Sequence, residues 1–313
     1  MLARTVSRAY KHSMESLNLR HVLIVTKARV PEAAELGQVI ARWIRGRCDG
    51  LNIIPAEQDS PHYDDPELDL VLVLGGDGTI LGVARRLFGR KIPLVSINFG
   101  RVGFLSDIEP DSWEESLTAM LEGSEYRSLA GLRWSLFRYG HLVNSGHAVN
   151  DVVISRAAMA RLVYVDISTN GERMGDVRAD GFLLSTPMGS SGYSVSAGGP
   201  LLHPSLDVVS FVPVCPFLNT IPTMVFPCHT VFRFHLLPGT TESYLTLDGQ
   251  EGHLMQTNDI VEVECVPDSV RFLGRGLSFI ERLRTRSFIL QNPLTYREKL
   301  TAPQPVKSES EDE

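Results

Sequence analysis

The chain has 313 residues, with 30 Lys and Arg against 37 Asp and Glu, so its formal net charge is −7. Its composition, 43% hydrophobic and 21% charged, is typical of a globular protein, and its length predicts about two domains. The acidic balance argues against nucleic acid as the main partner, because a phosphate-backbone binder needs a basic excess. No apolar run reaches the length of a transmembrane helix, so no membrane is expected as a partner either.

The first part of the chain alternates short apolar runs with stretches of helical periodicity. Strands that alternate with helices imply crossover connections and a parallel sheet. Residues 21–124 are therefore expected to form an open α/β domain, after a loose N-terminal extension over residues 1–20. The expected strands are residues 21–26, 51–54, 68–74 and 93–97, and the expected helices are residues 31–47, 80–88 and 111–121.

After about Ser124 the sequence becomes rich in strand-forming runs. A separate β-rich domain is predicted over residues 125–278, and residues from about 279 to 300 are expected to return to the first domain. The acidic end, residues 301–313, is expected to be disordered. The expected strands include residues 134–137, 149–154, 162–167, 182–184, 230–236, 244–247 and 260–264, with Asn170-Gly171 as a turn.

The four cysteines, Cys48, Cys215, Cys228 and Cys265, are too widely spaced for the CxxC pairs of zinc or thioredoxin-type sites. Buried thiols in a reducing compartment are expected instead, which favours a cytoplasmic location. The basic first twenty residues faintly resemble an organelle presequence, but a loose extension or a start at Met14 is the preferred interpretation.

A glycine-rich turn, residues 75–79 (GGDGT), follows an apolar strand and precedes a helix. Ligands of open α/β sheets gather at the carboxyl ends of strands. Glycines let backbone N–H groups approach a phosphate closely, and a helix N-terminus favours an anion. The turn is not one of the two common phosphate loops, because the chain has no Gly-Lys pair and Leu81 stands where GxGxxG needs its third glycine.

Asp77 lies in the middle of this turn, where a carboxylate would repel a phosphate unless it meets a proton, a cation or a hydroxyl. Phosphoryl transfer to an alcohol uses such a group to orient the hydroxyl and take its proton. The alternative is that Asp77 only caps the following helix. The five residues alone leave both interpretations open.

A second candidate segment, residues 180–200 (DGFLLSTPMGSSGYSVSAGGP), combines small hydroxyl side chains with one aromatic ring, Tyr193. Hydroxyls and a stacking ring suit a nucleotide, whereas the alternative is a flexible Ser/Gly loop. Asn150-Asp151 precedes an apolar run and could place two polar groups at the start of a strand, although such a pair is more often a turn.

These motifs resemble those of the NAD kinase family and occur in the family's order over roughly residues 21–286. GGDGT alone is shared with diacylglycerol and sphingosine kinases and, loosely, with phosphofructokinases, but its combination with DGFLLSTP and SAGGP is far more specific. The matching segments are residues 75–79 (GGDGT), 98–105 (NFGRVGFL), 150–153 (NDVV), 180–181 (DG), 185–187 (STP), 193–200 (YSVSAGGP) and 248–250 (DGQ).

The resemblance implies transfer of the γ-phosphoryl group of ATP to the 2′-hydroxyl of the adenosine ribose of NAD, giving NADP and ADP. Asp77 would be the proton acceptor, and Gly75, Gly76, Gly78 and Thr79 would line the phosphate path. The implied NAD contacts are Asp77, Gly78, Phe104, Asn150, Asp151, Arg161, Arg178, Asp180, Ser191, Gly192, Tyr193, Ser194, Val195, Ser196 and Gln250.

The family's architecture pairs an α/β domain, here with an open parallel sheet, with a β-rich, sandwich-like C-terminal domain, assembled as a homodimer or homotetramer. The resemblance implies the same two-domain, NAD kinase-like architecture here. Mg²⁺ or another divalent cation would accompany ATP without a dedicated protein metal site.

The chain departs from the family pattern at Met188, at Ser191-Gly192, and at Phe217 and Ile221. Met188 removes a hydroxyl donor and Gly192 removes a methyl group, while the phosphate turn and Asp77 are unchanged. An active enzyme is therefore expected. Two alternatives are a lipid or sugar kinase that shares the GGDGT turn, and a catalytically impaired dinucleotide-binding regulator.

Overall fold

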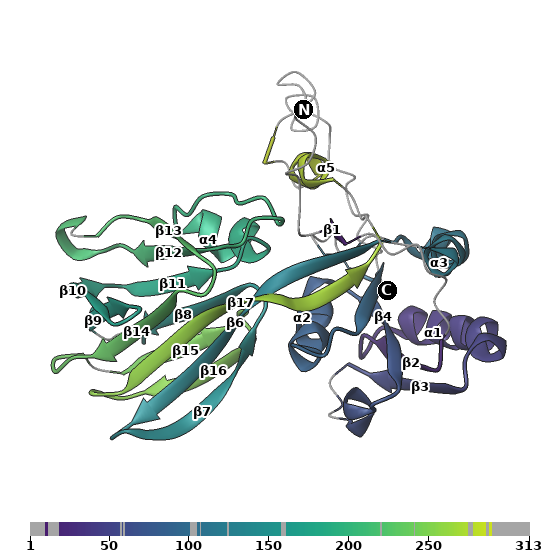
Figure 1. Cartoon of the computed structure of the whole chain (residues 1–313), viewed down its shortest axis with the longest axis horizontal. Helices are drawn as coiled ribbons and strands as arrows, with labels where there is room; N and C mark the ends of the chain where they lie inside the picture. The colour runs from purple at the N-terminus through teal and green to yellow at the C-terminus, as the bar shows by residue number, and fades with distance from the viewer. Residues whose placement is uncertain are drawn as a thin grey trace, which may run out of the picture. The chain divides into compact units, whose positions relative to one another are not determined.

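A computed structural model describes residues 10–11, 19–56, 58, 60–100, 105–106, 108–123, 125–157, 161–219, 221–240, 242–274, 278–285 and 288–289 (Figure 1). The chain divides into two compact units, residues 1–276 and 277–313. The second unit contributes helix α5 (Phe279–Thr285), and its return to the first domain stays a prediction. The predicted tail and nearly all of the N-terminal extension lie outside the described residues.

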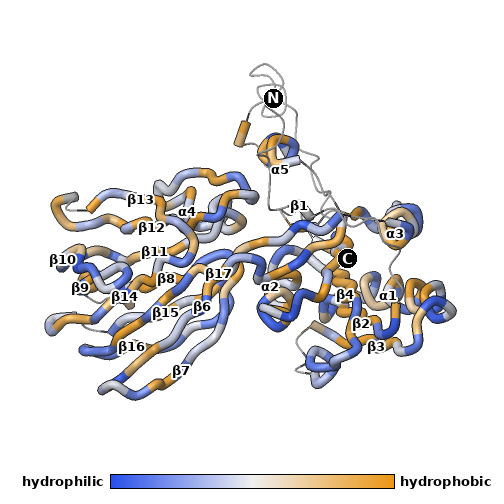
Figure 2. The backbone as a smooth tube through the Cα atoms, in the orientation of Figure 1, coloured by the Kyte–Doolittle hydropathy of each residue, from blue (hydrophilic) through white to orange (hydrophobic). Residues whose placement is uncertain are grey.

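The N-terminal part of the first unit is an α/β layer with parallel strands in the order β5-β4-β2-β3. Strands β2, β4 and β5 are buried on both faces and hydrophobic along most of their length (Figure 2), as parallel strands covered by helices are. The predicted α/β domain is confirmed. Its elements are β2 (His21–Thr26), α1 (Pro31–Ile44), β3 (Gly50–Pro55), β4 (Leu68–Gly75), α2 (Asp77–Arg86), β5 (Pro93–Asn98) and α3 (Trp113–Glu122).

The two faces of this sheet pack on different helices because successive side chains of a strand point to opposite sides. Val71 and Val73 of β4 lie in a core cluster with Ile80 of α2. Leu70 and Leu72 lie in another cluster with the apolar face of α1 and with Leu117 of α3. Helix α2 therefore covers one face of the sheet, and its first residue lies at the carboxyl end of β4.

The C-terminal part is a β-sandwich whose two sheets enclose a core containing Trp134, Phe182, Phe211, Phe232 and Phe234. One sheet is antiparallel throughout, in the order β13-β12-β11-β8-β15-β16. The sandwich-like domain is confirmed. Its strands are β6 (Tyr126–Arg138), β7 (His141–Ala148), β8 (Asp151–Arg156), β9 (Val163–Thr169), β10 (Glu172–Ala179), β11 (Gly181–Ser185), β12 (Val208–Val214), β13 (Met224–Pro227), β14 (Val231–Leu236), β15 (Ser243–Leu247), β16 (Glu251–Met255) and β17 (Ile260–Leu273).

The long strand β17 belongs to both parts of the first unit. Its beginning pairs with β14 of the sandwich, while Arg271 and Phe272 near its end pair in parallel with β5 of the α/β layer. Strand β6 runs antiparallel beside it over nearly the whole length, with an irregularity between Val266 and Val270. The α/β sheet and one sheet of the sandwich are therefore continuous, and the predicted boundary near Ser124 lies just before β6.

The predicted Asn170-Gly171 turn is confirmed, since it joins β9 to β10 and both residues have positive φ, 49° and 83°. This is the left-handed pair that a two-residue hairpin turn needs. None of the helices in the described part of the chain is long and apolar enough to span a membrane.

Cys228 and Cys265 form a disulfide, so the expectation of thiols throughout is wrong for this pair. The two residues are 37 positions apart in sequence, and β-strand pairing brings their Cα atoms to 5.1 Å. Cys48 and Cys215 are free. Because disulfides are rare in the cytoplasm, the cysteines no longer support the predicted cytoplasmic location.

Candidate functional site

The GGDGT turn joins the carboxyl end of β4 to the beginning of α2. Helix α2 begins at Asp77, and Gly76 is its N-cap residue with no side-chain cap. The first backbone N–H groups of a helix have no partner within the helix, and they are suited to holding a phosphate. The hypothesis that Asp77 is the helix cap is wrong, because Gly76 occupies that position.

The turn needs glycine because neighbouring atoms approach its backbone closely, and not because its backbone is left-handed. A Cβ on Gly75 would overlap the side chain of Thr79, and a Cβ on Gly100 would lie 3.1 Å from the Cα of Gly76. The Phe99 N–H donates to the carbonyl of Gly75 over 3.1 Å. The segment after β5 therefore packs directly on the phosphate turn, as the proximity of β4 and β5 dictates.

The Asp77 carboxylate accepts a hydrogen bond of 3.1 Å from the backbone N–H of Leu105. The side chain is only partly buried. Leu105, the last residue of the NFGRVGFL segment, thus fixes the direction of the carboxylate at the beginning of α2. Phe104, the neighbouring candidate, lies outside the described residues.

Asn150 and Asp151 lie at the junction between β7 and β8, where the STP segment supports them. The Thr186 N–H donates to the Asn150 carbonyl over 2.9 Å, and Thr186 Oγ1 donates to the Val149 carbonyl over 2.7 Å. Gly189 packs so closely on Asn150 that a Cβ would overlap its carbonyl. Asn150 Oδ1 is buried without a hydrogen-bond partner among the described residues, so it is available to a ligand.

The same junction is held from the other side by Asp248, whose side chain is fully buried. Its Oδ1 accepts from the N–H groups of Val149, Asn150 and Asp151 over 3.1, 2.7 and 3.1 Å. Its Oδ2 pairs with Arg85 of α2 at 3.0 Å. Burial, followed by the nearby charge of Asp248, raises the pKa of Asp151 to about 7.

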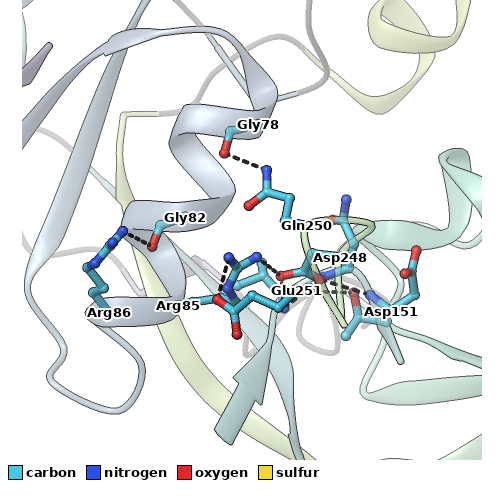
Figure 3. Close-up of polar contacts among 11 residues, drawn as sticks. Gly78, Gly82, Arg85, Arg86, Asp151, Asp248, Gln250 and Glu251 are labelled. Carbon is cyan, nitrogen blue, oxygen red and sulfur yellow. Dashed lines mark hydrogen bonds and ion pairs between the residues drawn. The ribbon is translucent and has the colours of Figure 1, made fainter. Parts of the chain in front are cut away.

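Sequence reasoning missed Arg85 and gave Asp248 no role. The only sequence signal for this ion pair was the DGQ motif, because Arg85 and Asp248 are 163 residues apart. Gln250 of that motif donates from Nε2 to the Gly78 carbonyl over 2.8 Å, so it lies beside the phosphate turn (Figure 3).

The Ser/Gly segment folds into a short 3-10 helix (Gly189–Ser191) and a helical turn, α4 (Tyr193–Ser196). Ser190 is bonded to the Pro187 carbonyl at 2.6 Å and to the Leu202 N–H at 3.0 Å. Ser194 is fully buried, yet its Oγ has no partner among the described residues. The flexible-loop interpretation is therefore wrong. Ser191, Gly192, Val195 and Ser196 are partly or fully exposed on this segment.

A pocket of about 290 Å³ lies beside α4. Tyr193, 49% exposed, lines it together with Asp180. Arg156 also lines the pocket and donates from Nε to Asp180 Oδ1 over 2.5 Å. Arg156 was not predicted, since it lies in a strand end without any recognised motif.

Two predicted contact residues, Arg178 and Arg161, lie on β10 and just before β9 of the sandwich. Arg178 is exposed on β10, and its guanidinium stacks on Tyr164 with its carbon 4.5 Å from the ring centre. Arg161 is exposed in the segment before β9.

Two of the departures from the family pattern, Met188 and Ile221, are buried in the cores. Met188 is 7% exposed and lies in the core cluster that contains Ile80 and Leu81 of α2. Ile221 is 9% exposed in the sandwich core, whereas Phe217 is 54% exposed. Met188 therefore packs as a core residue where the family pattern has a hydroxyl.

No group of three or more His, Cys, Asp or Glu side chains that could hold a metal occurs in the described ranges.

Comparison with known proteins gives two family models. The ATP-NAD kinase N-terminal domain matches residues 56–126, and the ATP-NAD kinase C-terminal domain matches residues 149–274. An NAD kinase of Nitratidesulfovibrio vulgaris (strain DSM 19637 / Miyazaki F) is 43% identical over 275 residues, covering 87% of this chain and 97% of the relative. An NAD kinase of Geotalea daltonii is 32% identical, covering 86% and 98%.

Two solved structures share the fold. Yeast NADH kinase complexed with NADH has a TM-score of 0.77 at 19% identity, covering 91% of this chain and 93% of that chain. An NAD kinase from Archaeoglobus fulgidus in complex with ATP has a TM-score of 0.65 at 23% identity, covering 85% and 99%.

Proposed function

This chain belongs to the NAD kinase family and is a phosphotransferase, and we propose that Asp77 is the proton acceptor of its reaction with the 2′-hydroxyl of the adenosine ribose of NAD. The position of Asp77 carries this proposal. Its carboxylate is directed by the Leu105 N–H at the beginning of a helix whose first N–H groups face no side-chain cap. A proton acceptor and a phosphate cradle are thus adjacent.

The chemistry at this turn is a direct displacement. The Asp77 carboxylate takes the proton of the 2′-hydroxyl as its oxygen forms a bond to the γ-phosphorus of ATP, while the bond to the β,γ-bridging oxygen breaks and ADP leaves. The phosphate contacts are backbone N–H groups of Gly75, Gly76 and Gly78, with the Thr79 hydroxyl as a further donor. The products are NADP and ADP.

The dinucleotide contacts belong to the sandwich side of the site. Asn150 Oδ1 and Ser194 Oγ are buried without partners in the described part of the chain, and a ligand that satisfies them gains hydrogen bonds that the free protein lacks. The exposed ring of Tyr193 is suited to stacking. The remaining proposed contacts are Asp77, Gly78, Phe104, Asp151, Arg161, Arg178, Asp180, Ser191, Gly192, Val195 and Ser196. Gln250, also predicted as a contact, donates instead to the Gly78 carbonyl.

A divalent cation such as Mg²⁺ would neutralise charge on the ATP phosphates. Asp77 and Thr79 lie nearest to where those phosphates would bind. A homodimer or homotetramer stays a prediction from the family resemblance, and light scattering on the purified protein measures it. The cytoplasmic location stays a prediction from the sequence.

The deciding experiment offers purified protein one acceptor at a time with ATP and Mg²⁺. NAD, NADH, diacylglycerol, sphingosine and fructose 6-phosphate are the acceptors, and polyphosphate replaces ATP in a parallel series. The proposal predicts NADP from NAD, with the phosphate on the 2′-oxygen. Phosphorylation of a lipid or sugar instead would contradict it, and so would calorimetric NAD binding with no turnover, which the regulator hypothesis predicts.

A further inference from the structure

The β15–β16 turn makes polar contacts with both ends of α2, through Gln250 and Asp248. Asp248 and Gly249 have positive φ, 51° and 64°, and the Gln250 N–H donates to the Leu247 carbonyl over 2.9 Å. A hairpin turn of this left-handed kind is rigid and needs glycine or a residue such as Asp at those positions. The turn therefore holds the side chains of Asp248 and Gln250 in fixed positions close to each other.

One face of α2 is shaped to receive this turn. Gly78 and Gly82 are four residues apart and therefore lie on the same face of the helix. A Cβ on Gly78 would lie 3.1 Å from the Gln250 amide, and a Cβ on Gly82 would lie 3.8 Å from it. Gln250 donates to the Gly78 carbonyl in the first turn of α2 (Figure 3). Arg85, near the end of α2, pairs with Asp248 at 3.0 Å and with Glu251 at 2.9 Å. The turn therefore holds α2 at both ends.

The same turn also holds the Asn150–Asp151 junction. The buried Asp248 carboxylate accepts three successive backbone N–H groups there and is paired with Arg85, whose side chain is 11% exposed. A buried carboxylate is tolerated when its charge is paired and its oxygens are hydrogen-bonded, and breaking one partner is costly. Motion of Asp248 would thus move the junction and α2 together.

We propose that Asp248, Arg85 and Gln250 form a positioning clamp that sets the placement of the proton acceptor Asp77 relative to Asn150 and Asp151. This inference rests on the proposed roles of Asp77 and Asn150. A displacement of about 1 Å between reacting groups can cost roughly 100-fold in rate. Gln250 acts through Gly78 in this proposal, because its amide donates to the Gly78 carbonyl.

The test compares Gln250→Ala, Arg85→Met and Arg85→Lys with wild type. Gln250 is exposed, so its truncation leaves the core intact. The matched control is Arg86→Met, which removes the next guanidinium of α2, a group that donates to the Gly82 carbonyl and lies over Tyr63. Each protein is measured for kcat, for KM of NAD and ATP, for calorimetric NAD affinity and for Tm.

We expect kcat to fall about 10- to 100-fold in Gln250→Ala and Arg85→Met, with KM and NAD affinity within about 3-fold of wild type. Arg85→Lys recovers part of the rate, since an ammonium group can pair with Asp248 but cannot bridge to Glu251 as a guanidinium does. Arg86→Met retains the wild-type kcat.

Two results would overturn the clamp while the function stands. If the variants lose only Tm and keep the wild-type kcat, the contacts are merely structural. If Gln250→Ala raises KM and weakens NAD binding with kcat unchanged, Gln250 is a direct ligand contact. Absence of NADP formation in wild type and Arg86→Met would overturn the proposed function itself, together with the clamp.

Discussion

The turn at residues 75–79 presents backbone N–H groups and one carboxylate at a helix start, whereas the region around Asn150 and Ser194 presents side-chain atoms that are buried and unbonded. Backbone donors are in place as soon as α2 forms. Buried side-chain atoms without partners destabilise the free protein until a ligand satisfies them. The turn, here called the phosphate side, is therefore organised for chemistry, and the region around Asn150 and Ser194, here called the sandwich side, is organised for recognition. Each prediction below tests one of these two sides.

The largest effect is expected from Asp77→Asn on the phosphate side. Asparagine keeps an oxygen that can accept from the Leu105 N–H, but it cannot take the substrate proton. NADP formation should slow by about 10²- to 10⁴-fold, with an unchanged Tm and NAD affinity. Steady-state assay, calorimetry and thermal unfolding measure the three quantities, and a variant that keeps most of its activity refutes the role of Asp77.

A large effect on the sandwich side is expected from Gly189→Ala. The added Cβ would overlap the Asn150 carbonyl, so the junction must shift, and the free energy of unfolding should fall by about 2–3 kcal/mol. Gly252→Ala in β16 is the matched control, since its Cβ meets nothing within 4 Å. Urea unfolding of both variants checks the prediction, which fails if Gly189→Ala is as stable as the control.

Asp151 should make stability depend on pH in a definite direction. Its pKa is raised from 3.8 to about 7, first by burial and then by the charge of Asp248. Between pH 4 and 7 the folded protein therefore keeps this proton while the unfolded chain releases it, so stability falls as pH rises through that window. Asp151→Asn removes this contribution.

The measurement is urea unfolding of wild type and Asp151→Asn from pH 5 to pH 8. Wild type should lose about 2 kcal/mol relative to the variant between pH 5 and 7, because each unit of pKa shift corresponds to about 1.4 kcal/mol. Parallel stability profiles would show that Asp151 ionises in the folded protein as an ordinary aspartate does.

The smallest effect separates two serines of one segment. Ser194→Ala removes an unbonded hydroxyl, so stability should hold while NAD affinity falls about 10-fold, the equivalent of one hydrogen bond. Ser190→Ala leaves the Leu202 N–H without its partner, so stability should fall by about 1–2 kcal/mol. Thermal unfolding and NAD titration of the pair test this, and equal losses of stability would contradict it.

Much of this architecture could be predicted because local patterns dictate it. Apolar runs and helical periodicity located β2, α1, β4 and β5, and the motif order indicated the family. Helix α2 begins three residues earlier than predicted, at Asp77 rather than Ile80. Glycine has low helix propensity, so Gly78 concealed the true first turn.

The contacts that connect the two sides could not be predicted. The pairing of Arg85 with Asp248, the Cys228–Cys265 disulfide and the passage of β17 from β14 to β5 all join segments that are distant in sequence. Neither composition nor periodicity records which strands become neighbours. The unbonded Ser194 and the fully bonded Ser190 likewise differ only in their three-dimensional surroundings.

The division between chemistry and recognition is tested most directly by one rate measurement. Asp77→Asn and Ser194→Ala are assayed side by side for NADP formation while NAD and ATP are raised to saturation. We predict that saturation restores Ser194→Ala to the wild-type rate and leaves Asp77→Asn slower by about 10²-fold or more. Recovery of Asp77→Asn at saturation, or persistent slowness of Ser194→Ala, would contradict the assignment of the two sides.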